Sequence, residues 1–314
     1  MSNLVFSLNA TMPLFIMIAF GFFLKKVNVI KDGFLASANK FNFTVTLPVL
    51  LFVDLSGADI RQAFDLKFLL FCAIATSIAF WGIWLVAKLV LKDKTYIGEF
   101  VQASYRSSAA VMGIALIQLI YGSSSMGGMM ILGCVPLYNI YAVIVLQAYS
   151  KDSQAGQGKL KKTLFGVLKN PIIIAVVLGL VASLIKIDFP QILDTVLNYL
   201  ARTATPLALI CIGADFNFTS ARKNLAPSVV AAIIKIIGLP VIFLPIAILM
   251  GFRNEALIAI FIMLAGPTTP SAYIMAKQYG NEGIITASCV VLTTLFSIVT
   301  LTFFVFLLKT LAFI

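Results

Sequence analysis

Residues 255–276 read EALIAIFIMLAGPTTPSAYIMA, an apolar run broken near its middle by two prolines. The run has the length of the ~20 residues that a helix needs to cross a bilayer. Pro267 and Pro270 each remove a backbone donor and crowd the preceding turn, so we expect the helix to break or kink near Pro267. Broken backbone at membrane depth is tolerated where it is buried or lines a wet cavity. The stretch therefore predicts a membrane helix with an interruption, either at a functional site or as an ordinary proline kink.

The whole chain has the composition of a polytopic membrane protein. Of its 314 residues, 61% are hydrophobic and 11% are charged, and its mean hydropathy is +1.04. A soluble fold cannot bury that share of apolar side chains, and no room is left for a soluble domain. The apolar runs predict ten helices near 9–24, 37–56, 66–91, 98–120, 127–149, 168–185, 192–213, 225–250, 255–276 and 284–308.

The basic residues indicate topology rather than nucleic-acid binding. The net charge is +11, but the positive residues are dispersed between apolar runs and form no basic domain face. With the N-terminus outside, fifteen of the 23 Lys and Arg residues fall on cytoplasmic connections and five on outer ones. We therefore expect both termini outside and the connection at 150–162 in the cytoplasm. Three basic residues stay within predicted helices, namely Arg106, Arg202 and Lys235.

An internal repeat is visible when the chain is shifted by 158 residues. The shift places Pro13 on Pro171, Gly21 on Gly179, Pro48 on Pro206 and Tyr121 on Tyr279. We interpret residues 1–150 as one five-helix repeat, 151–163 as a cytoplasmic linker and 164–314 as the second repeat. Because five is odd, the second copy enters the membrane from the opposite side, an inverted repeat typical of secondary transporters.

The fourth predicted helix carries a polar interruption at the position that corresponds to the prolines. Arg106, Ser107 and Ser108 lie within its apolar run. Paired interruptions in two repeats are a strong sequence indication of a transporter binding site. An arginine at that depth indicates an anionic substrate or a counter-charge, although Arg106 is near enough to the helix end to extend to the interface instead. We predict a substrate site formed by Arg106, Ser107, Ser108, Pro267, Thr268, Thr269, Pro270 and Ser271.

Three further polar residues sit inside apolar runs. Asn139 is a candidate for the same substrate site, with a structural hydrogen bond between helices as the alternative, and Asn42 is a further candidate. Asp54 is a carboxylate embedded in the second helix, and it is either a proton-coupling residue or an ion-pair partner. The chain contains no histidine and no phosphate-binding loop, so we expect no metal, no cofactor and no enzymatic activity.

The sequence resembles the auxin efflux carrier family of bacterial permeases, which includes malonate-transporter-like proteins and is related to the plant PIN-type auxin carriers. The resemblance covers essentially the whole chain. Its most specific parts are 267–272 (PTTPSA), 276–280 (AKQYG), 293–297 (TTLFS) and the stretch from Arg106 to Gly113 with Tyr121-Gly122 beyond it. It implies ten helices whose fourth and ninth members are unwound and cross, with helices three to five and eight to ten forming a mobile unit. It also implies a place in a bacterial cytoplasmic (inner) membrane, with several membrane passes. The chain departs from many relatives in having Ser108 and Ala115 where they carry an Asn and a Pro.

These expectations combine into a secondary transporter that moves a small organic anion, such as a carboxylate, by alternating access. Its other partners would be the lipid bilayer and, as a coupling ion, a proton or sodium; a homodimer is a candidate assembly, and nucleic acid is not expected. Two alternatives stay open. One is a sodium-coupled organic-anion symporter of the bile-acid-transporter type, and the other is a membrane receptor that binds the same ligand without moving it.

Overall fold

The computed structural model describes residues 2–57, 65–109, 113–121, 125–150, 169–185, 187 and 189–314. Within these ranges the chain is helical and forms no strand, in agreement with an all-α fold. The predicted linker at 151–163 lies outside the described residues. So do Arg61 and Lys186, two of the five basic residues that the charge count places on the outer side.

The helices of the first half follow the predicted apolar runs. They are α1 (Ser2–Lys26), α2 (Asp32–Phe41), the π-helical turn η1 (Asn42–Thr46), α3 (Leu47–Ser56), α4 (Leu66–Val90), the 3-10 turn η2 (Lys94–Tyr96), α5 (Ile97–Tyr105), α6 (Ile114–Tyr121) and α7 (Ser125–Ala148).

The helices of the second half include a second π-helical turn, η4. They are α9 (Pro171–Ile185), α10 (Gln191–Asp215), α11 (Phe218–Lys223), α12 (Leu225–Ile233), η4 (Ile234–Gly238), α13 (Leu239–Leu249), α14 (Asn254–Ala265), α15 (Ser271–Gln278) and α16 (Ile284–Thr310).

The outer helices present an apolar surface to their surroundings. Five helices among the described residues are long and apolar enough to cross a membrane: α4, Met126–Ala148 of α7, α10, the continuous segment Leu225–Leu249, and α16. Large apolar side chains on them point outward, and Leu89, Ile192 and Leu249 are 77%, 82% and 86% exposed. Exposing so large an apolar surface to water is unfavourable, whereas contact of the same surface with lipid is favourable. The chain is a multi-pass membrane protein.

Two helical segments are interrupted in the interior. The chain leaves α5 at Tyr105 with Arg106 extended, and it leaves α14 at Ala265 with Gly266 extended before α15 begins at Ser271. The residues of α5 and of α15 up to Ala276 are buried on every side, and so is α14 from Leu257 onward. A helix that is apolar and covered all round belongs to the core of the bundle. The interruptions therefore lie inside the protein rather than against lipid.

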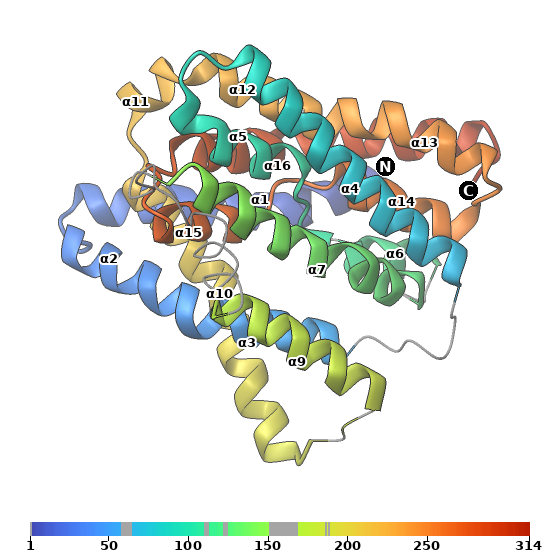
Figure 1. Ribbon diagram of the computed structural model, residues 1–314, viewed down its shortest axis with the longest axis horizontal. Helices are drawn as coiled ribbons and strands as arrows, with labels where there is room; N and C mark the ends of the chain where they lie inside the picture. The colour runs from blue at the N-terminus through green and yellow to red at the C-terminus, as the bar shows by residue number, and fades with distance from the viewer. Residues whose placement is uncertain are drawn as a thin grey trace, which may run out of the picture.

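The helices pack in two groups, and the second group contains the core helices α5, α14 and α15. One group contains α1, α2, η1, α3, α9 and α10, in which α1 packs on α10 and α3 packs on α9. The other contains α4 to α7 and α12 to α16, in which α4 and α5 pack on α7, α12 packs on α16 and α13 packs on α14. Figure 1 shows α3, α9 and the first half of α10 on the lower side and α4, α12, α13 and α14 on the upper side. The groups meet where α15 contacts α10 and η1, where α7 contacts α3 and α9, and where α1 contacts α16.

Glycines allow two helix pairs of the first group to touch backbone to backbone. A Cβ atom added at Gly21 of α1 would lie 2.2 Å from the Ile210 carbonyl oxygen of α10. A Cβ atom at Gly179 of α9 would lie 2.9 Å from Leu55 Cβ and 3.1 Å from the Phe52 carbonyl oxygen of α3. Small residues at such crossings let membrane helices approach closely and maximise packing where lipid supplies no hydrophobic drive.

Candidate functional site

The two interruptions are joined to each other by hydrogen bonds. The Ser108 amide donates to the Pro267 carbonyl at 2.9 Å, and the Ser107 hydroxyl donates to the Ile262 carbonyl at 3.0 Å. The Thr268 hydroxyl donates to the Ala103 carbonyl at 2.8 Å. Two of these contacts satisfy the carbonyls of Ala103 and Pro267, which is the condition for irregular backbone at membrane depth.

A cavity of about 50 Å³ lies beside this junction, between the two helix groups. From the second group it is lined by Arg106, Ser107, Ser108, Ala109, Val135, Tyr138, Asn139, Thr269 and Ser271, and from the first by Leu47, Leu50, Leu51, Asp54 and Thr205. Seven of these residues were singled out from the sequence: Asp54, Arg106, Ser107, Ser108, Asn139, Thr269 and Ser271. The structure thus brings them to one place from four separate helical segments.

Arg106 is the principal charge in this cavity. Its guanidinium donates to Asn139 Oδ1 at 2.8 Å and to Ser271 Oγ at 2.9 Å, and a further contact joins it to the Met275 sulfur at 2.7 Å. The residue is 3% exposed, so it does not extend to the membrane interface. Its partners are neutral, and it forms no ion pair within the described residues. A buried cation with neutral partners favours an anion as its counter-charge.

Asn139 and Thr269 complete the polar wall around Arg106. Asn139 is held in place because its amide donates to the Val135 carbonyl at 2.8 Å, which leaves its oxygen for Arg106. The Thr269 hydroxyl lies 3.1 Å from the Ser271 hydroxyl, which in turn accepts from Arg106. Each hydroxyl can also turn toward a ligand, since a hydroxyl both donates and accepts.

Asp54 lines the same cavity from α3. The residue is partly buried, and no hydrogen bond or ion pair joins its carboxylate to the rest of the described chain. It is the acidic residue among those that line this cavity together with Arg106.

The other four predicted site residues lie outside the cavity wall. Asn42 is fully buried and donates to the Ala204 carbonyl of α10 at 3.0 Å. The Thr268 amide donates to Thr293 Oγ1 at 2.9 Å, and the Thr268 hydroxyl donates to the Ala103 carbonyl. Pro267 supplies the carbonyl that binds Ser108, and Pro270 precedes the first turn of α15. In this conformation Pro267 and Thr268 support the junction, while Asn42 joins η1 to α10.

Lys235 is a buried charge on the other side of the same junction. It lies in the π-helical turn η4, where its ammonium donates to the carbonyls of Leu264 at 2.5 Å, Met263 at 3.2 Å and Tyr105 at 3.4 Å. The sequence marks it as a basic residue within an apolar run but gives no indication of these partners. Tyr138 and Thr205 were likewise outside the predicted site although both line the cavity, because neither residue type is unusual in a membrane helix.

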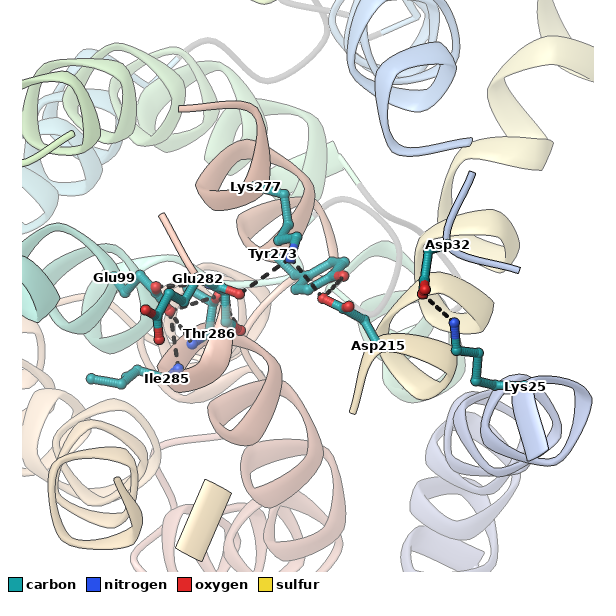
Figure 2. A network of polar contacts seen from close by, with 10 residues as sticks. Lys25, Asp32, Glu99, Asp215, Tyr273, Lys277, Glu282, Ile285 and Thr286 are labelled. Carbon is teal, nitrogen blue, oxygen red and sulfur yellow. Dashed lines mark hydrogen bonds and ion pairs between the residues drawn. The ribbon is translucent and has the colours of Figure 1, made fainter. Parts of the chain in front are cut away.

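A polar network connects the two helix groups through Asp215 and Lys277, and Figure 2 shows it from close by. Lys277 of α15 forms an ion pair with Asp215 of α10 at 2.8 Å, and the Tyr273 hydroxyl donates to the same carboxylate at 2.7 Å. These three residues border a second cavity of about 250 Å³, which is also lined by Asn217, Ser220 and Ser288. Across the network, buried Glu99 accepts from the amides of Gly283, Ile285 and Thr286 and caps the start of α16.

A multi-pass helical protein with a cationic cavity between two helix groups and interrupted helices at that cavity belongs to the class of membrane transporters. The comparison with known families agrees with this class. The profile of the membrane transport protein family matches residues 6–305. The chain belongs to this family, the auxin efflux carrier family.

Individual relatives resemble the chain over most of its length. It is 21% identical over 296 residues to an "Uncharacterized transporter" of Methanothermobacter thermautotrophicus, covering 94% of this chain and 96% of the relative. It is 23% identical to a "Putative malonate transporter" of Rhizobium meliloti, over 86% of each chain. It is 22% identical to "Uncharacterized transporter YfdV" of Escherichia coli, over 88% of this chain and 89% of that one. Among the described residues, no group of three or more His, Cys, Asp or Glu residues could hold a metal ion.

Proposed function

We propose that this protein is a secondary active transporter that moves a small organic anion through the cavity beside Arg106. The observation that carries the proposal is a buried guanidinium whose partners Asn139 and Ser271 are neutral, placed between two helix groups. A carboxylate matches the geometry of a guanidinium and would supply the missing negative charge. Ser107, Ser108 and Thr269 offer hydroxyl groups around the same space.

The size of the cavity favours a mechanism in which the helix groups move. About 50 Å³ admits only a few water molecules, so an organic anion needs a wider opening. We infer that α4 to α7 and α12 to α16 move as one unit against α1 to α3, α9 and α10. The link between Asp215 and Lys277 joins the two groups, and it must break for ligand to pass at that end. Alternating access then consists of opening the two ends of the shared cavity in turn.

The inverted five-helix repeat fits the positions of the helices in the chain. A shift of 158 residues takes α4 at 66–90 onto 224–248, close to Leu225–Leu249, and α5 at 97–105 onto 255–263, within α14. The same shift relates the glycine crossings, because Gly21 packs on Ile210 while Gly179 packs on Phe52. Two caps are also alike although their glutamates are 156 residues apart, since Glu99 binds the start of α16 and Glu255 accepts from the Met126 amide at the start of α7. We therefore keep residues 1–150 and 164–314 as the two repeats.

The charge distribution supports an orientation with both termini outside a bacterial cytoplasmic membrane. In that orientation the end closed by Asp215 and Lys277 faces the cytoplasm, and Asp54 lies toward the outer end of α3. Labelling single cysteines at Ser2 and Gln154 with an impermeant thiol reagent in intact cells tests this. Reaction at Gln154 but not at Ser2 would reverse the orientation.

The relative named for malonate makes a small dicarboxylate the first substrate to test. Purified protein in liposomes should take up or exchange a labelled carboxylate from a panel that includes malonate. Arg106→Gln should weaken binding by ~2 kcal/mol or more, about thirtyfold, because it removes the counter-charge. Arg222→Gln, an exposed arginine on α11, is the matched control and should leave flux unchanged. Ligand binding without flux would instead identify a receptor.

A further inference from the structure

Lys235 is a fully buried charge that the proposed ligand cavity does not include. It is 0% exposed, and it lies in a π-helical turn in the middle of the continuous segment Leu225–Leu249. No ion pair neutralises it within the described residues. Its ammonium group is instead surrounded by the main-chain oxygens of Tyr105, Met263 and Leu264.

These three oxygens belong to the carboxyl ends of both interrupted helices. Tyr105 is the last residue of α5, and Met263 and Leu264 are in the last turn of α14. The carbonyls of a last helical turn have no intrahelical donors and carry the negative end of the helix dipole. Two such ends therefore converge on one point, and Lys235 places a positive charge there.

The number of contacts fits the ammonium form of the side chain. A protonated lysine has three N–H donors and no acceptor, and it meets three carbonyl oxygens here. Carbonyl oxygens at the unwound ends of broken membrane helices are also the ligands with which transporters hold a sodium ion. The chain thus offers the acceptors of a cation site and fills them with its own side chain.

We propose that Lys235 is a built-in cation that holds the carboxyl ends of α5 and α14 together, so that transport requires no bound sodium ion. The proposal rests on the proposed transport function and adds the coupling ion to it. It argues against the sodium-coupled symporter, because these three main-chain oxygens at the junction, which sodium could otherwise use, are already occupied by Lys235.

The first test uses the wild-type protein. Carboxylate flux in liposomes should be the same when sodium is replaced by choline on both sides, and sodium should not shift the thermal midpoint of the purified protein. A loss of flux without sodium would overturn the proposal, whatever the behaviour of variants.

The second test empties the site. Lys235→Ala should lower flux in choline by about tenfold or more, because two helix ends lose their counter-charge. Millimolar sodium or lithium should restore part of that flux and raise the thermal midpoint of this variant but not of the wild type. Lys94→Ala is the matched control, since Lys94 also donates to helix-end carbonyls, those of Lys88 and Leu91, but is exposed. Lys235→Arg keeps the charge and should stay independent of sodium.

A folded Lys235→Ala protein that no alkali cation stabilises or reactivates would also overturn the proposal. The thermal measurement separates this result from failure of the proposed function. If no carboxylate is transported, but sodium stabilises only the alanine variant, the transport proposal fails while the assignment of Lys235 stands.

Discussion

Lys277 Nζ on α15 lies 2.8 Å from Asp215 Oδ2 on α10, and this ion pair joins the two helix groups at one end of their interface. Tyr273, one turn before Lys277, donates to the same carboxylate. Both ion-pair side chains are about a third exposed, at 30% and 32%, so solvent screens the attraction and we expect it to contribute ~1 kcal/mol at most. Such a link is strong enough to bias a conformational equilibrium and weak enough to be broken in each transport cycle.

Breaking this link should favour opening at the Lys277 end. In a background without native cysteines, Ser271→Cys reports access to the cavity. Adding Asp215→Asn should raise its labelling rate from the Lys277 side by up to about fivefold, as expected for ~1 kcal/mol. Lys25→Gln breaks the pair with Asp32, which lies within one helix group, and should change nothing. Equal labelling in all three proteins would show that the link does not control access.

Gly213 should be essential for the packing of α10 on α1. A Cβ atom there would lie 1.9 Å from the Ile18 carbonyl oxygen, so alanine forces the two backbones apart. We expect Gly213→Ala to cost ~1–3 kcal/mol and to lower the thermal midpoint in detergent. Gly82 is the control, because a Cβ atom at this glycine of α4 meets nothing within 4 Å and alanine should be tolerated. Equal midpoints for the two variants would contradict the crossing as described.

The sequence predicted the helices well because their signal is local. Apolar runs of membrane length and the proline pair at Pro267 and Pro270 are visible without any neighbour, and the helix bounds follow them closely. It also indicated seven of the fourteen residues that line the cavity, in part because Arg106, Asn139 and Asp54 are residue types that lipid disfavours. A polar residue in an apolar run must face the protein interior, so several of them tend to meet there.

The sequence could not predict which polar residues support the backbone and which face the cavity. Thr268 and Thr269 are adjacent and chemically identical, yet one bonds to the Ala103 carbonyl and the other lines the cavity. That difference depends on the exact direction of an extended segment and on a helix more than a hundred residues away. The partners of Lys235 are hidden for the same reason, since they are main-chain oxygens and no residue type marks them.

The two threonines should therefore respond differently to the same substitution. Thr268→Val removes the donor to a buried carbonyl and should lower stability by ~1 kcal/mol with little change in ligand affinity. Thr269→Val should leave stability nearly unchanged and weaken carboxylate binding by ~1 kcal/mol, about fivefold. Thermal midpoints and ligand titrations of both variants give the comparison. The reverse pattern would place Thr268, rather than Thr269, at the ligand.

Asp54 should determine whether transport depends on pH. Its carboxylate lines the cavity without a hydrogen bond or ion pair in the described structure, so it is free to bind a proton when an anion occupies Arg106. Asp54→Asn should abolish the pH dependence of flux while ligand still binds. The readout is initial flux between pH 5 and 8, with Asp194→Asn, an exposed carboxylate near the start of α10, as the control. An unchanged pH profile in Asp54→Asn would remove this residue from coupling.

The proline pair should be required for transport but not for folding. Pro267 and Pro270 keep α14 and α15 apart, and the freed Pro267 carbonyl accepts from Ser108. Replacing both by alanine supplies two backbone donors and lets helical hydrogen bonding continue across the interruption. A continuous helix would use the carbonyl of residue 267, which now accepts from the Ser108 amide, in its own hydrogen bonding. It would also move Thr269 and Ser271 relative to Arg106. We expect unchanged or higher thermal stability and a loss of flux of about tenfold or more, since displaced polar contacts cost ~1.4 kcal/mol or more together.

Pro245→Ala, in the outward-facing part of α13, is the control for proline removal as such and should keep its flux. Full flux in a correctly folded double variant would mean that these prolines are ordinary kinks and that the cavity is not the transport site.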